Sequence, residues 1–185
     1  MTKRKIVVVP YDPEWENWFN HLGEYLKASL GEVALRIDHI GSTAVEGLSA
    51  KPIVDVQISV ADLQQLEAFR IPLTGLGFVF RENNPDLTKR YFREKPGNRR
   101  THIHVRQAGS YAEQEALLFR DYLRTHPVEA SEYGQLKQLL AQEYQDHPHT
   151  YVEQKAPTIH AILMKARVWS QEIGWFPGPA FTFAC

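Results

Sequence analysis

The segment 52–60 constrains what this 185-residue chain can fold into more than any other part of it. Side chains alternate along a β-strand, so every second residue lies on the same face. One face of this segment is apolar and is formed by Val54, Val56, Ile58 and Val60. The opposite face carries Asp55 and Gln57. We therefore expect a sheet with one buried apolar face and a carboxylate displayed on the other.

Hydrophobic periodicity places further strands in the first two thirds of the chain. Apolar residues at helical spacing predict helices over 12–30 and 62–76. Alternation predicts strands at 33–40, 78–81, 88–94 and 99–106, the last two joined as a hairpin.

The last third is expected to be helical. Ser110 with Glu113, and Thr150 with Glu153, have the spacing of a capping box, in which two side chains satisfy the first amide groups of a helix. They predict helices over 111–125 and 150–172, with another helix between them. The tail 175–185 is too apolar to stay in water, so we expect it to pack on the body or on a partner, which allows a homodimer. Its aromatic residues are Trp175, Phe176, Phe181 and Phe183.

Length and composition predict one globular domain, sheet-rich over 1–108 and helical over 109–174, with the apolar tail at 175–185. The 21 Lys and Arg residues balance 22 Asp and Glu residues. This balance argues against bulk nucleic-acid or membrane binding, so an anion must be bound locally. No stretch approaches the roughly 18–20 apolar residues of a membrane span, and no signal peptide is recognisable. The single cysteine, Cys185, excludes an internal disulfide and fits a cytoplasmic protein.

The turn between the strands predicted at 33–40 and 52–60 contains Gly41, Ser42 and Thr43. Glycine permits a tight turn, and the hydroxyl and amide groups that follow could hold phosphate oxygens. A phosphate held there would lie beside Asp55. An ordinary strand-to-helix turn capped by Ser42 explains the same residues equally well, so both interpretations remain open.

Asp55 needs a partner, because a carboxylate in the middle of an apolar strand is disfavoured unless it is paired, bound to metal or hydrated. One partner would be a salt bridge to Arg36 or Arg106. The other would be a metal ion shared with His102 and His104, which lie two residues apart and therefore on one face of their strand. Two ordinary histidines on a half-exposed sheet face are the simpler alternative.

The predicted hairpin concentrates positive charge. Seven basic residues face one acid, Glu94, between positions 89 and 106: Lys89, Arg90, Arg93, Lys95, Arg99, Arg100 and Arg106. This excess suits the electrostatic attraction of a phosphorylated substrate, and it equally suits a solvated hairpin.

Five motifs, in this order, resemble those of the GrpB family, within the nucleotidyltransferase superfamily of DNA polymerase beta-like fold. They are Tyr11-Asp-Pro-Glu-Trp15, His39-Ile-Gly-Ser-Thr-Ala-Val45, Gly47-Leu-Ser-Ala-Lys-Pro-Ile-Val-Asp55, Arg100-Thr-His-Ile-His-Val105 and Phe119-Arg-Asp-Tyr-Leu-Arg124. The resemblance runs from about residue 8 to residue 166. It implies an α+β fold, with a nucleotidyltransferase-like mixed β-sheet flanked by helices and a helical C-terminal third.

The resemblance also implies a metal site. In active superfamily members, two acids on one strand and a third on a later strand hold two Mg²⁺ ions that align a hydroxyl with the α-phosphate of a nucleotide. Here Gln57, a weak uncharged ligand, replaces the second acid, and the later strand offers His102 and His104. One divalent ion, Mg²⁺, Mn²⁺ or Zn²⁺, or none, is therefore implied.

We therefore expect a nucleotidyltransferase-like protein that binds a nucleotide or another phosphorylated small molecule. The expected catalytic residues are Asp55, His104 and Lys51. The expected phosphate-binding residues are Gly41, Ser42, Thr43, Arg100, Arg120 and Lys155. The expected metal ligands are Asp55, Gln57, His102 and His104. A non-catalytic nucleotide-binding module and a metal-dependent phosphoester hydrolase using His102, His104 and Asp55 are the alternatives.

Overall fold

The computed structural model describes residues 5–181. Within this range the strands are β1 (Arg36–Ile40), β2 (Val54–Val60), β3 (Phe78–Phe80), β4 (Arg90–Glu94) and β5 (Thr101–Gln107). The helices are α1 (Glu14–Leu30), α2 (Leu66–Gly75), α3 (Tyr111–Thr125), α4 (Pro127–Glu143) and α5 (Pro148–Ile173). Short 3-10 turns cover Gly31–Val33 and Ser42–Ala44.

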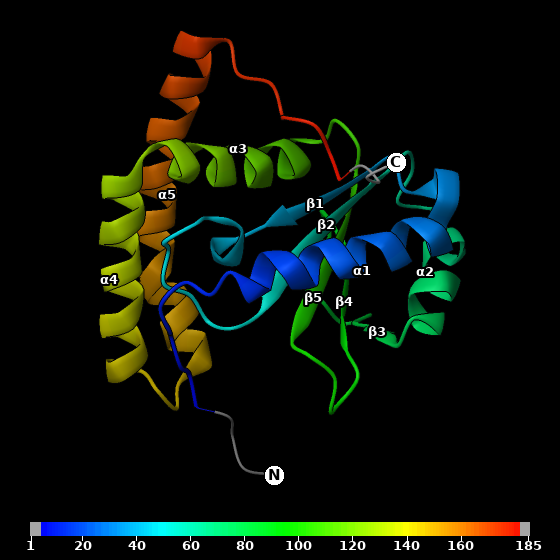
Figure 1. The fold of residues 1–185 in the computed structure, drawn as a ribbon, viewed down its shortest axis with the longest axis horizontal. Coiled ribbons are helices and arrows are strands. Elements are labelled where there is room, and N and C mark those ends of the chain that lie inside the picture. The colour runs from blue at the N-terminus through cyan, green and yellow to red at the C-terminus, as the bar shows by residue number, and fades with distance from the viewer. Residues whose placement is uncertain (1–4, 182–185) are drawn as a thin grey trace.

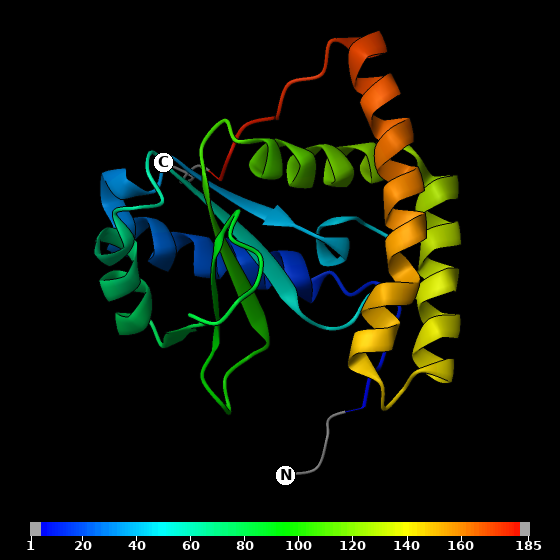
Figure 2. The ribbon, with the colours of Figure 1, turned by 180° about the vertical axis from the view of Figure 1, so that it is seen from behind.

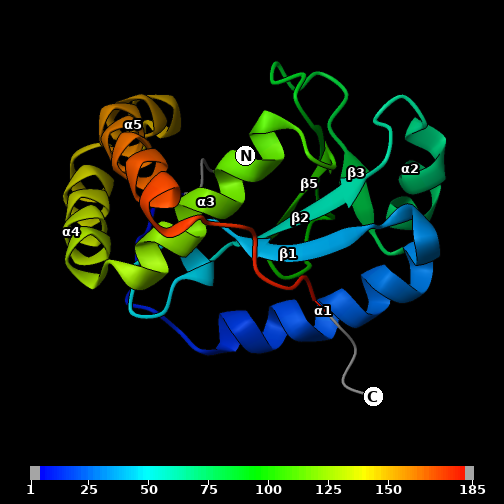
Figure 3. The same ribbon diagram turned by 90° about the horizontal axis from the view of Figure 1, so that it is seen from above.

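The strands form one mixed sheet in the order β1-β2-β5-β4-β3. The central pair β2 and β5 is parallel, and the other neighbouring pairs are antiparallel. Helices α1 and α3 lie on opposite faces of this sheet, and α4 and α5 stand side by side at one end of it (Figures 1 and 3). The expected α+β fold, with a mixed sheet and a helical C-terminal third, is confirmed.

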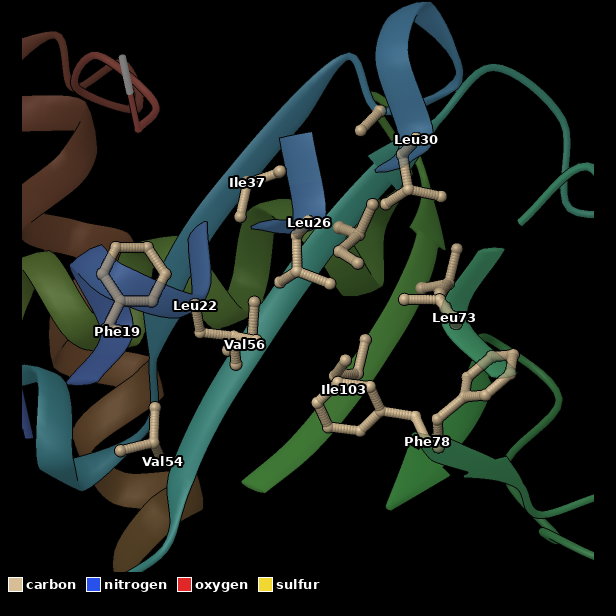
Figure 4. Packing of buried hydrophobic residues seen from close by; sticks show 14 of the residues in the cluster. Phe19, Leu22, Leu26, Leu30, Ile37, Val54, Val56, Leu73, Phe78 and Ile103 are labelled. Carbon is tan, nitrogen blue, oxygen red and sulfur yellow. The ribbon is translucent and has the colours of Figure 1, made fainter. Parts of the chain in front are cut away.

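The apolar face of the sheet packs against α1 and α2. Phe19, Leu22, Leu26 and Leu30 of α1 lie over the valines of β2 and Ile103 of β5 (Figure 4). Side chains at the centre of this core, such as Val56, Ile58 and Ile103, have no solvent exposure. The alternation along 52–60 therefore places Asp55 on the opposite, polar face.

A second core lies between the helices of the C-terminal third. Leu48, from the loop between β1 and β2, packs there with Tyr122, Tyr133 and Ile162. The view from behind shows α4 and α5 alongside each other, beyond the end of the sheet (Figure 2). The loop before β2 is thus fixed between the sheet and the paired helices.

Several predicted boundaries differ from the structure, among them the following three. The strand predicted from residue 33 begins at Arg36, because Gly31, with φ 53°, ends α1 and residues 31–33 form a 3-10 turn. The helix predicted from residue 62 begins at Leu66. Thr150 does not cap a helix, since α5 already begins at Pro148, a residue suited to the first helical position. The capping role of Ser110 is confirmed, because its hydroxyl accepts a hydrogen bond from the Glu113 amide at 3.3 Å.

The described part of the tail contacts the body of the protein. The Phe181 amide donates a hydrogen bond to the Ile37 carbonyl at 2.9 Å, and Trp175 Nε1 donates to Asp121 Oδ2 at 3.2 Å. Phe176 is 84% exposed. Phe183 and Cys185 lie outside the described residues, and the homodimer stays a prediction. In the described chain, no helix combines the length and the hydrophobicity needed to span a membrane.

Candidate functional site

Strands β2 and β5 bring three titratable side chains together on the polar face. Their parallel register sets Asp55 beside His102 and Gln57 beside His104. Asp55 Oδ1 lies 3.2 Å from His102 Nδ1 and 3.1 Å from His104 Nε2. The three potential ligand atoms lie within 4.8 Å of one another, so one ion could reach all of them. We call these residues the Asp-His-His cluster.

The protonation states within the cluster suit metal binding. Burial alone would raise the pKa of Asp55, but the hydrogen bonds from His102 and His104 outweigh it and hold that pKa below its usual range. Burial lowers the pKa of His104, which favours the neutral imidazole. An ionised carboxylate and neutral imidazoles are the forms that bind a divalent ion. Two imidazole nitrogens and one carboxylate suit a single Zn²⁺ or Mn²⁺ ion better than Mg²⁺, which prefers oxygen ligands.

The salt bridges considered for Asp55 are not made. Arg36 Nη2 lies 2.9 Å from Asp38, and Arg106 donates instead to Gln57 Oε1 at 2.5 Å. Both arginines therefore have other acceptors.

Gln57 lies beside His104 on the sheet, but its amide group is engaged by other residues. Its side chain is fully buried, Nε2 donates to the Glu113 carbonyl at 3.3 Å, and Oε1 accepts from Arg106. Because both ends of the amide are engaged, Gln57 would have to give up a hydrogen bond to bind a metal ion, and its role as a ligand stays a prediction. One carboxylate remains, rather than the pair that two-metal catalysis uses.

Gly41 is required by a close approach to Asp55. It has φ +72°, and a Cβ atom there would lie 2.9 Å from Asp55 Oδ2. A larger residue would meet both a strained backbone and the carboxylate. The turn that contains Gly41 therefore holds the Asp55 side chain against the histidines.

The two hydroxyls after Gly41 differ in their surroundings. Thr43 Oγ1 donates to the Ile53 carbonyl at 3.2 Å and lies 3.0 Å from His39 Nε2, so His39 acts as the donor to it. Burial lowers the pKa of His39 to about 3, which keeps this imidazole neutral. The Thr43 hydroxyl is thus committed to the fold, while Ser42 lines the adjacent pocket.

A pocket of about 200 Å³ opens beside the Asp-His-His cluster. Three lysines line it: Lys51 from the loop before β2, Lys137 from α4 and Lys155 from α5. Asp55 is the only acidic residue among the described lining residues. We call this space the lysine pocket. It brings together the sheet, the turn at residues 42–44 and both helices of the C-terminal pair.

Aromatic rings hold the lysine ammonium groups in place. Lys51 Nζ and Lys155 Nζ lie 4.5 Å and 4.6 Å from the centre of the Tyr151 ring, and Lys137 Nζ lies 4.5 Å from the Tyr133 ring. Cations over aromatic faces gain about 0.5–2 kcal/mol, which offsets part of their desolvation. Each helix carries its tyrosine and lysine four residues apart, so that both side chains lie on one face.

Lys137 is the lysine of this pocket whose charged form is least favourable. It is 3% exposed, and Nζ has no hydrogen-bond partner among the described residues. Burial, together with repulsion from Lys155 and Lys51, lowers its pKa to about 7. Burial and repulsion from Lys51 likewise lower the pKa of Lys155 to about 8. A bound anion would restore the charged form of both groups.

Two other residues, Arg100 and Arg120, are predicted to contact phosphate. Arg100 lines a neighbouring groove, and Arg120 lines neither that groove nor the lysine pocket. Arg120 Nη1 donates to Asp38 Oδ1 at 3.3 Å and to the His39 carbonyl at 3.1 Å, so its guanidinium joins the sheet to α3. The prediction from the sequence did not include Lys137 among the phosphate-binding residues. The repeated Tyr-x-x-x-Lys spacing of α4 and α5 is the signal that could have identified it.

The fold and this geometry define a mixed-sheet α+β protein with a cationic pocket beside an Asp-His-His cluster. Residues 5–165 match the family described as GrpB protein, and the chain belongs to this family. The crystal structure of the conserved protein GrpB from Enterococcus faecalis is similar, with a TM-score of 0.81 and 33% identity, covering 88% of this chain and 99% of that one.

Two curated relatives from other bacteria are also similar. UPF0157 protein PA4798 of Pseudomonas aeruginosa is 37% identical over 169 residues, covering 88% of this chain and 68% of that protein. UPF0157 protein YqkA of Bacillus subtilis is 36% identical over 170 residues, covering 91% of this chain. The chain spans about half (49%) of the length of YqkA.

Proposed function

We propose that the lysine pocket binds the phosphate groups of a nucleotide. The observation that carries this proposal is the Lys137 ammonium group, which is buried, has no hydrogen-bond partner among the described residues and shares the pocket with two further lysines. Burying a charge without compensation costs several kcal/mol, so such a group is explained best by an anion that it binds. Lys51, Lys137 and Lys155 together would match the charge of a diphosphate or triphosphate.

The Asp-His-His cluster would hold one divalent ion next to those phosphates. When bound, such an ion neutralises charge on phosphoryl oxygens and orients them for displacement. Asp55 supplies the negative charge of the site, and His102 and His104 supply nitrogen ligand atoms. Gly41 keeps the Asp55 carboxylate in place by leaving room for it.

The reaction that this arrangement suits is nucleotidyl transfer, the reaction of the superfamily that the family resembles. The hydroxyl oxygen of an acceptor forms a bond to the α-phosphorus, and the bond from that phosphorus to pyrophosphate breaks. The hydroxyl proton passes to Asp55 Oδ2, the carboxylate oxygen that does not face the two imidazoles. Lys51 neutralises charge that develops on the phosphoryl group.

A thermal-shift panel tests the binding proposal. The four nucleoside triphosphates are each added with chelator, Mg²⁺, Mn²⁺ or Zn²⁺ to the wild type, Lys137→Met and Lys165→Met. A ligand at 100 times its dissociation constant adds about 2.7 kcal/mol of stability, which is several degrees at this chain length. We expect a shift in the wild type and in Lys165→Met but not in Lys137→Met. Lys165 is the control because it lies on α5 outside the pocket, with its side chain 59% exposed.

Absence of any shift with all four nucleotides would refute nucleotide binding. A shift that persists in chelator, without pyrophosphate release at any metal concentration, would favour a non-catalytic nucleotide-binding module. In both cases the transferase proposal would be abandoned.

Phosphoester hydrolysis is a second candidate, favoured by the presence of two histidines and one carboxylate in the cluster. Here water replaces the acceptor hydroxyl. Its oxygen forms a bond to a phosphorus atom, the bond from that phosphorus to the ester oxygen breaks, and the alcohol and inorganic phosphate are released. Assays for the released product separate the two reactions. Inorganic phosphate released without an acceptor supports hydrolysis, whereas acceptor-dependent pyrophosphate supports transfer.

A further inference from the structure

A larger cavity adjoins the lysine pocket. It has a volume of about 590 Å³ and shares Lys51 and Ile53 with that pocket. Five basic residues line it, and Glu94 is the only acid among its described lining residues. The basic residues are Lys5, Lys51, Arg81, Arg93 and Arg100. We call this space the basic groove.

The single acid of the basic groove does not neutralise it. Glu94 Oε1 lies 3.0 Å from Arg100 Nε and 3.7 Å from Arg93 Nη2, and its other oxygen accepts from the Thr101 amide at 3.2 Å. Arg93 Nε is buried and has no hydrogen-bond partner among the residues described. The groove therefore keeps a surplus of positive charge that an anionic ligand would satisfy.

The basic groove is directed toward the reacting centre. Arg93 on β4 lies directly opposite His102 on β5. Lys51 lines both cavities. Burial, together with repulsion from Arg100 and Arg93, lowers the pKa of Lys51, and the negative charge of Asp55 opposes this shift. A molecule in the groove would thus lie next to a nucleotide held by Lys137 and Lys155, with Lys51 within reach of both.

The remaining lining residues indicate what kind of molecule fits. They are isoleucine, valine and proline, and no aromatic side chain is among the described residues that line the groove. Single-stranded nucleic acids are held by aromatic side chains that stack on the bases, and the groove offers none. Aliphatic walls with arginines favour a compound that has an anionic end and an aliphatic body.

We propose that the basic groove binds the second substrate, and that this substrate is an aliphatic compound carrying a phosphate group held by Arg93 and Arg100. Its role as the acceptor rests on the proposed function. Its binding does not, because Arg93 and Arg100 line the groove and not the lysine pocket, so the groove can be occupied with that pocket empty.

Titration calorimetry of the full chain with n-hexyl phosphate tests this inference. We expect binding that is tighter than that of inorganic phosphate. Arg93→Gln and Arg100→Gln should each weaken it by about tenfold or more, the usual effect of losing a charged hydrogen bond. Arg99→Gln is the matched control, because Arg99 lies on the same hairpin but its side chain donates to the Glu14 carbonyl on α1.

Several results would overturn the inference. These are the absence of hexyl phosphate binding, equal affinity in the two arginine variants and the wild type, or loss of binding in Lys137→Met, which would place the ligand in the lysine pocket. Displacement by a short oligothymidylate that binds more tightly would indicate a nucleic-acid acceptor instead. If hexyl phosphate binds through Arg93 and Arg100 while no nucleotide binds, the groove inference stands and the proposed function fails.

Discussion

Lys137 is the residue at which charge and burial oppose each other most strongly. Its ammonium group is enclosed by Tyr133 and by two other lysines, and the fold gives it no acceptor among the described residues. Natural proteins commonly retain such a destabilising group where a ligand uses it. The buried ammonium group should therefore lower the stability of the ligand-free protein by a measurable amount.

Replacing Lys137 by methionine should stabilise the ligand-free protein. The folded pKa of about 7 lies below the ordinary 10.5, so the unfolded chain binds more protons between those pH values and stability rises with pH across that window. Below pH 7 the full penalty applies. We expect a gain of about 1–3 kcal/mol at pH 7, or roughly 2–10 °C in Tm, and a flatter rise of stability from pH 7 to pH 10.

Thermal denaturation of both proteins at several pH values measures this effect. Lys165→Met, which removes an exposed charge from α5, serves as the control. A Lys137→Met protein less stable than the wild type at pH 7 would show that the ammonium group has a structural partner.

Comparison of Gly41 with Gly47 distinguishes the effect of backbone strain from the effect of contact with Asp55. Gly41 and Gly47 have similar positive φ angles, 72° and 77°, but a Cβ atom at Gly47 would meet nothing within 4 Å. Each Gly→Ala change should cost about 1–2 kcal/mol from the backbone alone. Gly41→Ala should cost more and also weaken Zn²⁺ binding, because it displaces the Asp55 carboxylate.

Chemical denaturation and Zn²⁺ titration of the two alanine variants give the comparison. Equal stability losses and equal Zn²⁺ affinities would contradict the role assigned to Gly41.

At the scale of elements, the parallel register of β2 and β5 creates the Asp-His-His cluster. Asp55→Asn removes the one negative charge and leaves the shape of the site. Loss of this ligand should weaken Zn²⁺ binding by about 100-fold or more, since even indirect partners of a metal ligand contribute about 10–100-fold. Competition against a chromophoric chelator measures this affinity, with the exposed Asp146→Asn as control. Unchanged affinity would remove the cluster from consideration as a metal site.

The sequence predicts these elements well where periodicity is regular. The alternation of 52–60 identified β2 and its polar face, and the His-x-His spacing of β5 placed both imidazoles on one face. The helix start predicted at Thr150 is wrong. The spacing of Thr150 and Glu153 fits a capping box, but Pro148 already begins the helix two residues earlier. The surroundings of Lys137 are not predictable from the sequence, because its neighbours come from the loop before β2, from α4 and from α5, and only packing brings these segments together.

Gln57 shows the same limit of prediction from the sequence, because the partners of its amide group also depend on packing. Its place two residues after Asp55 favoured a shared site, since side chains at that spacing lie on one face. The structure turns its amide toward Arg106 and α3 instead, because a fully buried amide must satisfy its donor and its acceptor.

At the scale of the whole molecule, the lysine pocket depends on how α4 and α5 are held against the sheet. Leu48 joins these parts, because it lies in the loop before β2 yet packs in the second core, with Cδ1 3.3 Å from where a Cβ on Gly134 of α4 would lie. Leu48→Ala should cost about 2–5 kcal/mol and should also weaken nucleotide binding by shifting Lys51 relative to Lys137.

Urea denaturation and calorimetry of Leu48→Ala test that coupling. Leu87→Ala is the control, because Leu87 is 78% exposed. Loss of stability with unaltered ligand affinity would show that the pocket does not depend on this contact.

The most direct test of the central claim is the affinity of inorganic triphosphate for the wild type, Lys137→Met and Lys165→Met, measured by calorimetry in the presence of chelator. This probe has no base or sugar and needs no metal, and the Lys137→Met variant separates binding in the lysine pocket from binding in the basic groove. The proposal predicts binding that takes up protons near pH 8, is unchanged in Lys165→Met and falls by about tenfold or more in Lys137→Met. Equal affinity in all three proteins, or no binding to the wild type, would contradict it.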